Sequence, residues 1–203
     1  MNYLAHLFLS EQNSESLLGN LLGDFVKGKN YNNLSDSVIK GIDNHRIIDK
    51  FTDSHQSVIL SKNLISKERK RFSGIIIDIF YDYFLIKNWS TYTTCNLNET
   101  IAEWYDLLEA AIDKTTPQKA INTILTMKQE NWLLSYHSAE GIAQALTRVS
   151  NRIRYQNNLI GAENELLIHG NELEQHFKIF FPDLISHVNT TAKIKNLKDM
   201  LDT

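Results

Sequence analysis

Residues 41–55, GIDNHRIIDKFTDSH, hold the side chains of this chain that are best suited to chemistry. Wound as an α-helix at about 100° per residue, the stretch places His45, Asp49 and Asp53 on one narrow face, with Arg46 at its margin. An ordinary solvated helix face is rich in long Lys and Glu side chains, whereas this face combines an imidazole with short carboxylates. These are groups that a metal or phosphate site uses.

Two further carboxylates, Asp78 and Asp82, stand one helical turn apart in GIIIDIFYDYFLIKNW, which is apolar almost all round. Burying an unpaired carboxylate is costly, so each must meet a metal ion, an arginine or several N–H donors. A role as metal ligands is therefore one possibility. A buried ion pair is the other, with three candidate partners: Arg46, Arg69 and Arg71.

His6 in NYLAHLFL and Asp24 in GNLLGDF also interrupt apolar sequence. Each has a purely structural alternative, His6 as a hydrogen-bonded core residue and Asp24 as the end of a helix. The candidates together all fall within the first 82 residues: His6, Asp24, His45, Asp49, Asp53, His55, Asp78 and Asp82. Histidine and carboxylate without thiolate favour Mn²⁺, Mg²⁺, Fe²⁺ or Zn²⁺, and such a site most often polarises a phosphoryl oxygen and activates water.

The composition and the absence of certain motifs argue against several other classes of protein function. The 203-residue chain has a formal net charge of -3, which argues against generic nucleic-acid binding. Its single Cys95 excludes an internal disulfide and a zinc site with several Cys ligands. There is no GxxxxGK[ST] or GxSxG motif and no GxGxxG after a strand, so P-loop, serine-hydrolase and Rossmann functions lose support.

The N-terminal MNYLAHLFLS has no preceding Lys or Arg and is a poor signal peptide. The longest apolar run, residues 75–86, is too short to span a bilayer and holds two carboxylates. We therefore expect a cytoplasmic protein without a membrane span.

The elements that must position these residues are predicted to be helices, because apolar positions recur at three and four residues and only two prolines occur. Ser35 is expected to cap the helix that carries His45, and Pro182 to end a later helix. No repeat or linker divides the chain, so residues 1–203 are expected to form one multi-helix domain. The predicted helices cover residues 2–10, 14–27, 35–53, 57–70, 74–88, from Asn98, from Pro117, 132–136, 138–155, 161–181 and 183–201.

Four motifs in this order, NYLAHLFLS, GNLLGDFVKG, GIDNHRIIDKFTDSH and GIIIDIFYDYFLIKNW, resemble the acyl carrier protein phosphodiesterase family. A weaker match continues through NWLLSYHSAEGIAQALTRVSNR and FKIFFPDL, so the resemblance covers nearly the whole chain. It implies an all-α, HD-domain-like fold, distantly similar to the HD-type metal-dependent phosphohydrolases.

The implied reaction is hydrolysis of the phosphodiester that joins 4′-phosphopantetheine to a serine of holo acyl carrier protein, giving the apo protein. Mn²⁺ is the favoured cofactor, with Mg²⁺ or Fe²⁺ possible. The expected metal ligands are His45 and Asp24 together with His6 or Asp78. The expected roles of the others are charge compensation by Arg46, proton donation to the departing serine oxygen by His55 or Asp53, and orientation of the ligands by Asp49 and Asp82.

The chain departs from the family pattern at Phe8 and Tyr83, where the family commonly has His, and we expect both positions to be peripheral. Because an acyl carrier protein is strongly acidic, basic residues are expected to dock it. The expected docking residues are Lys62, Lys67, Arg69, Lys70 and Arg71, with Lys27 or Lys29. Two alternatives are a phosphohydrolase of a nucleotide or other small phosphoester, and a non-catalytic carrier-protein binding module.

Overall fold

The computed structural model describes residues 1–28, 31 and 33–192. Within these residues the chain forms α-helices and one short 3₁₀ helix, and no strand, which confirms the all-α prediction. The elements are α1 (Tyr3–Phe8), α2 (Ser14–Leu22), α3 (Asp36–Ser54), α4 (Gln56–Leu64), η1 (Lys70–Phe72), α5 (Ser73–Lys87), α6 (Trp89–Tyr92), α7 (Leu97–Ala110), α8 (Gln118–Gln129), α9 (Trp132–Ser135), α10 (Ala139–Arg152) and α11 (Asn164–Thr191).

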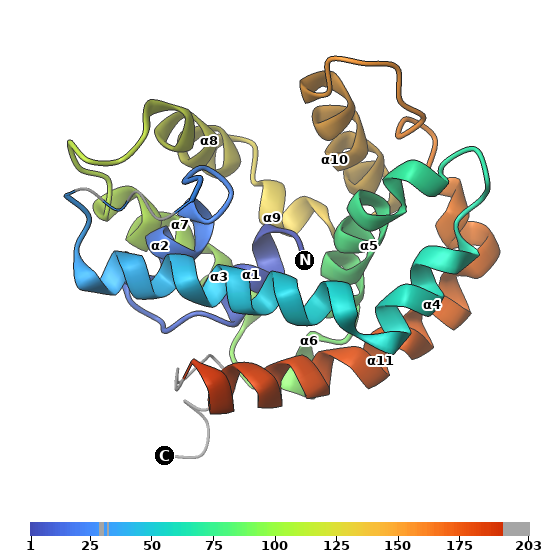
Figure 1. Cartoon of the computed structure of the whole chain (residues 1–203), viewed down its shortest axis with the longest axis horizontal. Coiled ribbons are helices and arrows are strands. Elements are labelled where there is room, and N and C mark those ends of the chain that lie inside the picture. Colours follow the sequence, from blue (N-terminus) through green and yellow to red (C-terminus); the bar gives the residue numbers. More distant parts are fainter. Residues whose placement is uncertain (29–30, 32, 193–203) are drawn as a thin grey trace.

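The long helix α3 runs across the molecule, and α11 lies along the same side below it in Figure 1. At one end, α2 packs against α3 and α7; at the other, α4 and α5 pack against α11, and α10 against α5. The short helix α1 contacts both α2 and α5, so it joins the two ends. No helix in the part of the chain that the structure describes is long and apolar enough to cross a membrane.

Helix α5 is central and buried, as its apolar sequence predicts. Ile76, Ile77, Phe80 and Tyr81 are fully inaccessible to solvent. The same hydrophobic cluster takes in apolar side chains from the first helix to the last. Asp82 is buried within it, so the fold surrounds a carboxylate with apolar side chains.

A close crossing of α2 and α3 sets the position of the candidate residues on both helices. A Cβ atom at Gly19 would lie 2.2 Å from the carbonyl oxygen of Val38, and one at Gly41 would lie 2.6 Å from that of Ser16. Since real side chains do not tolerate such contacts, only glycine permits this approach at both positions. The crossing brings the polar face of α3 against the end of α2.

The predicted helix end at Pro182 is wrong, because α11 continues through the proline to Thr191. A proline inside a helix costs about 3 kcal/mol, since it removes a backbone hydrogen bond and crowds the preceding turn. The buried face of α11 is uninterrupted across this position, and its packing outweighs that cost. The buried residues are Phe177, Phe180, Phe181, Leu184, Ile185 and Val188. The last predicted helix extends beyond residue 192, outside the described residues.

Other helix boundaries also differ from the prediction. Helix α2 ends at Leu22 rather than residue 27, and α4 ends at Leu64 rather than residue 70. After α4, the backbone N–H and hydroxyl of Ser66 both donate to Glu165 of α11, which ends the helix by competing for its hydrogen bonds. The cap of α7 is Asn96, two residues before the predicted start.

Candidate metal centre

His6, His45 and Asp49 form a compact cluster between α1 and α3. Their potential ligand atoms all lie within 4.8 Å of one another. Nε2 of His45 is 3.0 Å from one carboxylate oxygen of Asp49, and Nε2 of His6 is 3.2 Å from the other. The two imidazole rings stack with their centroids 4.0 Å apart. Two imidazoles and a carboxylate that converge in this way are a ligand set suited to a divalent metal ion.

The local sequence explains why these side chains converge. His45 and Asp49 are four residues apart on α3 and so share one face. The ring of His45 lies against Gly23, where an added Cβ would be only 2.2 Å from Cγ of the imidazole. The turn that follows α2 therefore needs glycine at this position to admit the ring.

Asn20 of α2 orients the imidazole of His6. Its Oδ1 atom lies 3.0 Å from Nδ1 of His6, and both side chains are buried. With the amide oxygen as acceptor, Nδ1 carries the proton and Nε2 turns its lone pair toward Asp49. That buried Nε2 atom has no hydrogen-bond partner among the described residues. A lone pair facing a carboxylate is repulsive unless a cation lies between them, so the residues fit a metal ion.

The electrostatics of the cluster agree with this arrangement. Burial, together with the neighbouring His45, lowers the pKa of His6 to about 4, so its ring is neutral near pH 7. Burial opposes ionisation of Asp49, but the hydrogen bond from His45 and the charge of the nearby α-amine of Met1 hold the pKa of its carboxyl below the usual value. A neutral imidazole at His6 and an ionised carboxylate at Asp49 are the protonation states that metal binding requires.

Asp24 and Asp78 lie beside the cluster. Oδ1 of Asp24 is 3.7 Å from Nε2 of His45. Partial burial raises the pKa of Asp24 above its usual value, against the opposing effect of His45. The α-amine of Met1 lies 3.0 Å from Asp78 and 3.8 Å from Asp49, so it separates Asp78 from the imidazoles. Asp24 is thus the better placed of the two to complete a metal site.

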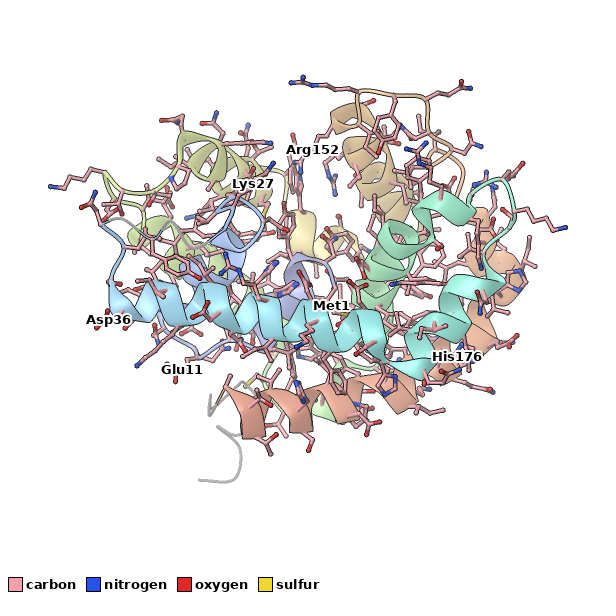
Figure 2. The ribbon with its side chains drawn as sticks, viewed as in Figure 1. Met1, Glu11, Lys27, Asp36, Arg152 and His176 are labelled. Carbon is pink, nitrogen blue, oxygen red and sulfur yellow. The ribbon has the colours of Figure 1, made fainter. Side chains whose placement is uncertain are left out.

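A pocket of about 290 Å³ opens next to the cluster. Asp24 and Asp78 contribute to one part of its wall, and Lys119 of α8 and Arg152 of α10 contribute two cations. Figure 2 shows Arg152 at the end of α10 that faces α8, with Met1 nearer the centre of the molecule. A substrate in this pocket would lie against Asp24 and Asp78, beside the candidate centre.

Comparisons with known proteins agree with the motifs. The model of the family described as acyl carrier protein phosphodiesterase matches residues 1–184. The chain belongs to this family. Relatives of that name are 33% identical over 183 residues in Photorhabdus laumondii (90% of this chain, 92% of the relative) and 33% over 189 residues in Yersinia enterocolitica (92% and 96%). One from Escherichia coli is 30% identical over 200 residues (95% and 100%).

Membership of the acyl carrier protein phosphodiesterase family confirms the resemblance identified from the four motifs. No solved structure matches the chain. The predicted similarity to HD-type phosphohydrolases therefore stays a prediction.

Asp82 has a different environment from the rest of the predicted site. Its two oxygens accept hydrogen bonds from the backbone N–H groups of Leu4, at 2.9 Å, and Ala5, at 3.2 Å. The carboxylate therefore caps the first turn of α1, and burial raises its pKa to about 7 although these donors lower it. Among the residues that the structure describes, neither Asp82 nor Asp78 pairs with an arginine, so the alternative of an ion pair with Arg46, Arg69 or Arg71 is wrong for both. Asp82 instead positions the helix that carries His6.

Arg46 points away from the cluster. Its guanidinium donates to the hydroxyl of Tyr31 and to the carbonyl oxygen of Gly28, and lies 3.6 Å from Asp43. These contacts tie α3 to the segment after α2. The structure does not bring Arg46 to the pocket where its predicted charge compensation would be needed.

His55 and Asp53, the predicted proton donors, make other contacts at the end of α3. Nε2 of His55 lies 3.2 Å from Asp183 of α11, while its Nδ1 accepts from the backbone N–H of Ser57 and caps α4. Asp53 is exposed and accepts a hydrogen bond from Lys62 at 2.8 Å. Neither residue lines the pocket beside the cluster, and their catalytic roles stay predictions.

The two departures from the acyl carrier protein phosphodiesterase pattern are also outside the cluster. Phe8 is fully buried and packs against Trp89 and Phe181. Tyr83 lines a different pocket, between α5, α10 and α11. Neither position belongs to the cluster of His6, His45 and Asp49. That both are peripheral to the activity stays a prediction.

Sequence reasoning missed Asn20, Lys119 and Arg152. A signal for Asn20 was present, because it is a polar residue in an otherwise apolar helix and lies one turn before Asp24. The segment NWLLSYHSAEGIAQALTRVSNR ends on Arg152 and belongs to the weaker part of the family match. No spacing rule linked Lys119 to a site contributed by the first 82 residues.

Several of the predicted docking residues already have partners within the chain. Lys62 pairs with Asp53, and Arg69 contacts Glu68 and the buried Glu165. Lys70 donates to Asn63 and to the carbonyl oxygen of Lys62, and the guanidinium of Arg71 stacks 4.7 Å from the ring of Tyr155. Among these residues, Lys67, Lys70 and Arg71 are exposed, as is Lys27. Lys29 lies outside the described residues.

Proposed function

We propose that this protein hydrolyses the 4′-phosphopantetheine–serine phosphodiester of holo acyl carrier protein and releases the apo protein. The observation that carries the proposal is the convergence of His6, His45 and Asp49 beside an open pocket in a chain of the acyl carrier protein phosphodiesterase family. The orphaned Nε2 of His6 supports a cation at this point.

His6, His45 and Asp49 would hold the metal, with Asp24 alongside, and Mn²⁺ is the ion we propose. Bound there, a divalent ion supplies Lewis acidity toward phosphoryl oxygens and toward water. The chain's own contribution is positional: Asn20 fixes the tautomer of His6, and Asp82 anchors the helix that carries it.

The acidic carrier protein is proposed to dock on exposed cations of the segment that joins α4 to α5. Of the predicted set, Lys67 has no ion-pair partner among the described residues, and Arg71 stacks on Tyr155 with its charge still exposed. These two residues can attract an acidic surface without first breaking an internal salt bridge. Arg69 is committed to the buried Glu165 and contributes to folding instead.

The test is incubation with holo acyl carrier protein, with Mn²⁺ or with a chelator, followed by intact-mass measurement of the carrier. With Mn²⁺ the wild type should remove the phosphopantetheine group, and with the chelator it should not. His45→Ala should remain folded by circular dichroism and release none.

Different failures point to different alternatives. If the mass of the carrier stays unchanged with wild type and Mn²⁺ while a small phosphodiester is cleaved, the phosphohydrolase alternative replaces this proposal. If the carrier binds but neither substrate is cleaved, the protein is a binding module. Wild-type conversion by His45→Ala would reject the proposed metal site.

A further inference from the structure

The pocket beside the cluster has walls of opposite charge. Asp24 and Asp78 line it near the candidate metal centre, and Arg152 and Lys119 line it from α10 and α8. Asp24 and Arg152 therefore face the same cavity of about 290 Å³ from different helices or turns. An elongated ligand could therefore contact the metal centre and both cations at once.

Neither cation is paired with a carboxylate in the part of the chain that the structure describes. The guanidinium of Arg152 lies 5.6 Å from the ring centroid of Trp132 and shares the pocket lining with Tyr3, and both of these neighbours are uncharged. Lys119 is exposed at the start of α8 and forms no ion pair with any of the residues that the structure describes. By contrast, Lys62, Lys87 and Lys128 all have carboxylate partners. The pocket thus keeps two positive charges available for an anion.

The contacts of Arg152 also orient it. Trp132 is buried and supports one face of the guanidinium, while Tyr3 belongs to α1, the helix that carries His6. A planar guanidinium held in this way can donate two parallel hydrogen bonds to phosphate oxygens. Arg152 is also the last residue of α10, where a positive charge interacts favourably with the helix dipole. This interaction does not depend on whether the side chain lines the pocket.

We propose that Arg152, assisted by Lys119, binds the phosphate oxygens of the substrate from the side of the pocket opposite the metal centre. This inference rests on the proposed function and deepens it, by assigning the charge compensation that had been expected of Arg46. Arg46 is committed to Tyr31 and Gly28 and lies outside the pocket lining. The ligand class is a phosphate ester that carries a chain beyond the phosphate.

The binding test uses metal-free protein, so that it does not depend on turnover. 4′-Phosphopantetheine is titrated into wild type, Arg152→Gln and Lys119→Gln by isothermal calorimetry, with pantetheine, which lacks the phosphate, as the second probe. Arg152→Gln should weaken binding of the phosphate ester by at least about tenfold, because a charge-assisted bidentate contact is lost. Lys119→Gln should weaken it less, and pantetheine should bind all three proteins equally.

Arg154→Gln is the matched control, because Arg154 is exposed two residues further along and does not line the pocket. It should bind the phosphate ester as wild type does. Arg152→Lys should recover only part of the affinity, since it restores the charge without the planar fork. With holo acyl carrier protein and Mn²⁺, Arg152→Gln should raise KM at least as much as it weakens binding.

Unchanged binding of 4′-phosphopantetheine by both Arg152→Gln and Lys119→Gln would overturn the inference. An equal loss in Arg154→Gln would also overturn it, because the effect would then come from general surface charge. If wild type binds the phosphate ester through Arg152 but never converts holo acyl carrier protein, the anion site stands and the proposed reaction fails.

Discussion

The Nε2 atom of His6 lies 3.2 Å from Oδ1 of Asp49, yet it forms no hydrogen bond. Asn20 accounts for this by accepting a hydrogen bond from Nδ1 of His6, so that Nδ1 carries the ring proton and Nε2 carries none. The two electron-rich atoms are then held together by the packing of α1 against its neighbours, at a cost in stability that a bound cation would remove. The cluster is arranged for a ligand that the polypeptide itself does not provide.

Replacing Asp49 by Asn should therefore lower the affinity for Mn²⁺ by at least about 100-fold. The amide keeps the shape but loses the charge between the two imidazoles, and removal of even an indirect partner of a metal ligand costs 10- to 100-fold. Calorimetric titration of Mn²⁺ measures the change. Asp36→Asn, at the exposed start of the same helix, should bind Mn²⁺ as wild type does; equal affinities in wild type and Asp49→Asn would exclude this cluster as the metal site.

Gly23→Ala should displace the imidazole of His45, because the new Cβ would lie 2.2 Å from its Cγ atom. Overpacking of this kind costs about 1–3 kcal/mol, so the melting temperature should fall together with the Mn²⁺ affinity. The control is Gly170→Ala in α11, where the nearest atom to an added Cβ is 3.9 Å away. That variant should be as stable as wild type or more so. A Gly23→Ala protein with unchanged Tm and metal affinity would contradict this account of the turn.

Asp82→Asn should change how stability depends on pH. Burial raises the pKa of Asp82 to about 7 in the folded protein, above its ordinary value near 3.8. The unfolded chain therefore loses this proton first, and the contribution of Asp82 to stability, present at low pH, is lost as the pH rises toward 7. Each unit of pKa difference corresponds to about 1.4 kcal/mol.

The free energy of unfolding in urea, measured between pH 4 and 8, checks this expectation. Relative to Asp82→Asn, wild type should lose several kcal/mol of stability across that range. Parallel profiles for the two proteins would show that the carboxyl ionises in the fold as it does in water.

The double variant Lys67→Glu and Arg71→Glu should raise KM for holo acyl carrier protein and flatten its dependence on ionic strength, because exposed charges act mainly on association. Steady-state kinetics at two salt concentrations measure both effects. The control is Lys40→Glu with Lys114→Glu, which makes the same change in net charge at exposed residues elsewhere. If both double variants raise KM equally, docking at the α4–α5 segment is rejected.

Much of the local structure followed from the sequence, since helix periodicity and capping depend on neighbouring residues. Ser35 caps α3 as predicted, through its hydroxyl and the N–H of Val38. The apolar sequence of α5 correctly predicted a buried helix, and the cost of burying a carboxylate correctly predicted that Asp82 must have donors. The same argument, that a polar residue within an apolar helix needs a partner, identified His6 as a candidate.

Which of these candidates meet depends on how the helices pack. Helical spacing placed Arg46 beside His45 on α3. In the fold, Arg46 contacts Tyr31, whereas the ring of His45 stacks on that of His6. The close crossing of α2 and α3 at Gly19 and Gly41 sets these partners. The continuation of α11 through Pro182 likewise depends on an apolar face that only packing reveals. Sequence spacing specifies the face of a helix on which a side chain lies, whereas the partner of that face depends on how the helices cross. For this reason the sequence determined the helices, the family and the set of His and Asp candidates, and the fold alone assembled His6, His45 and Asp49 opposite Arg152.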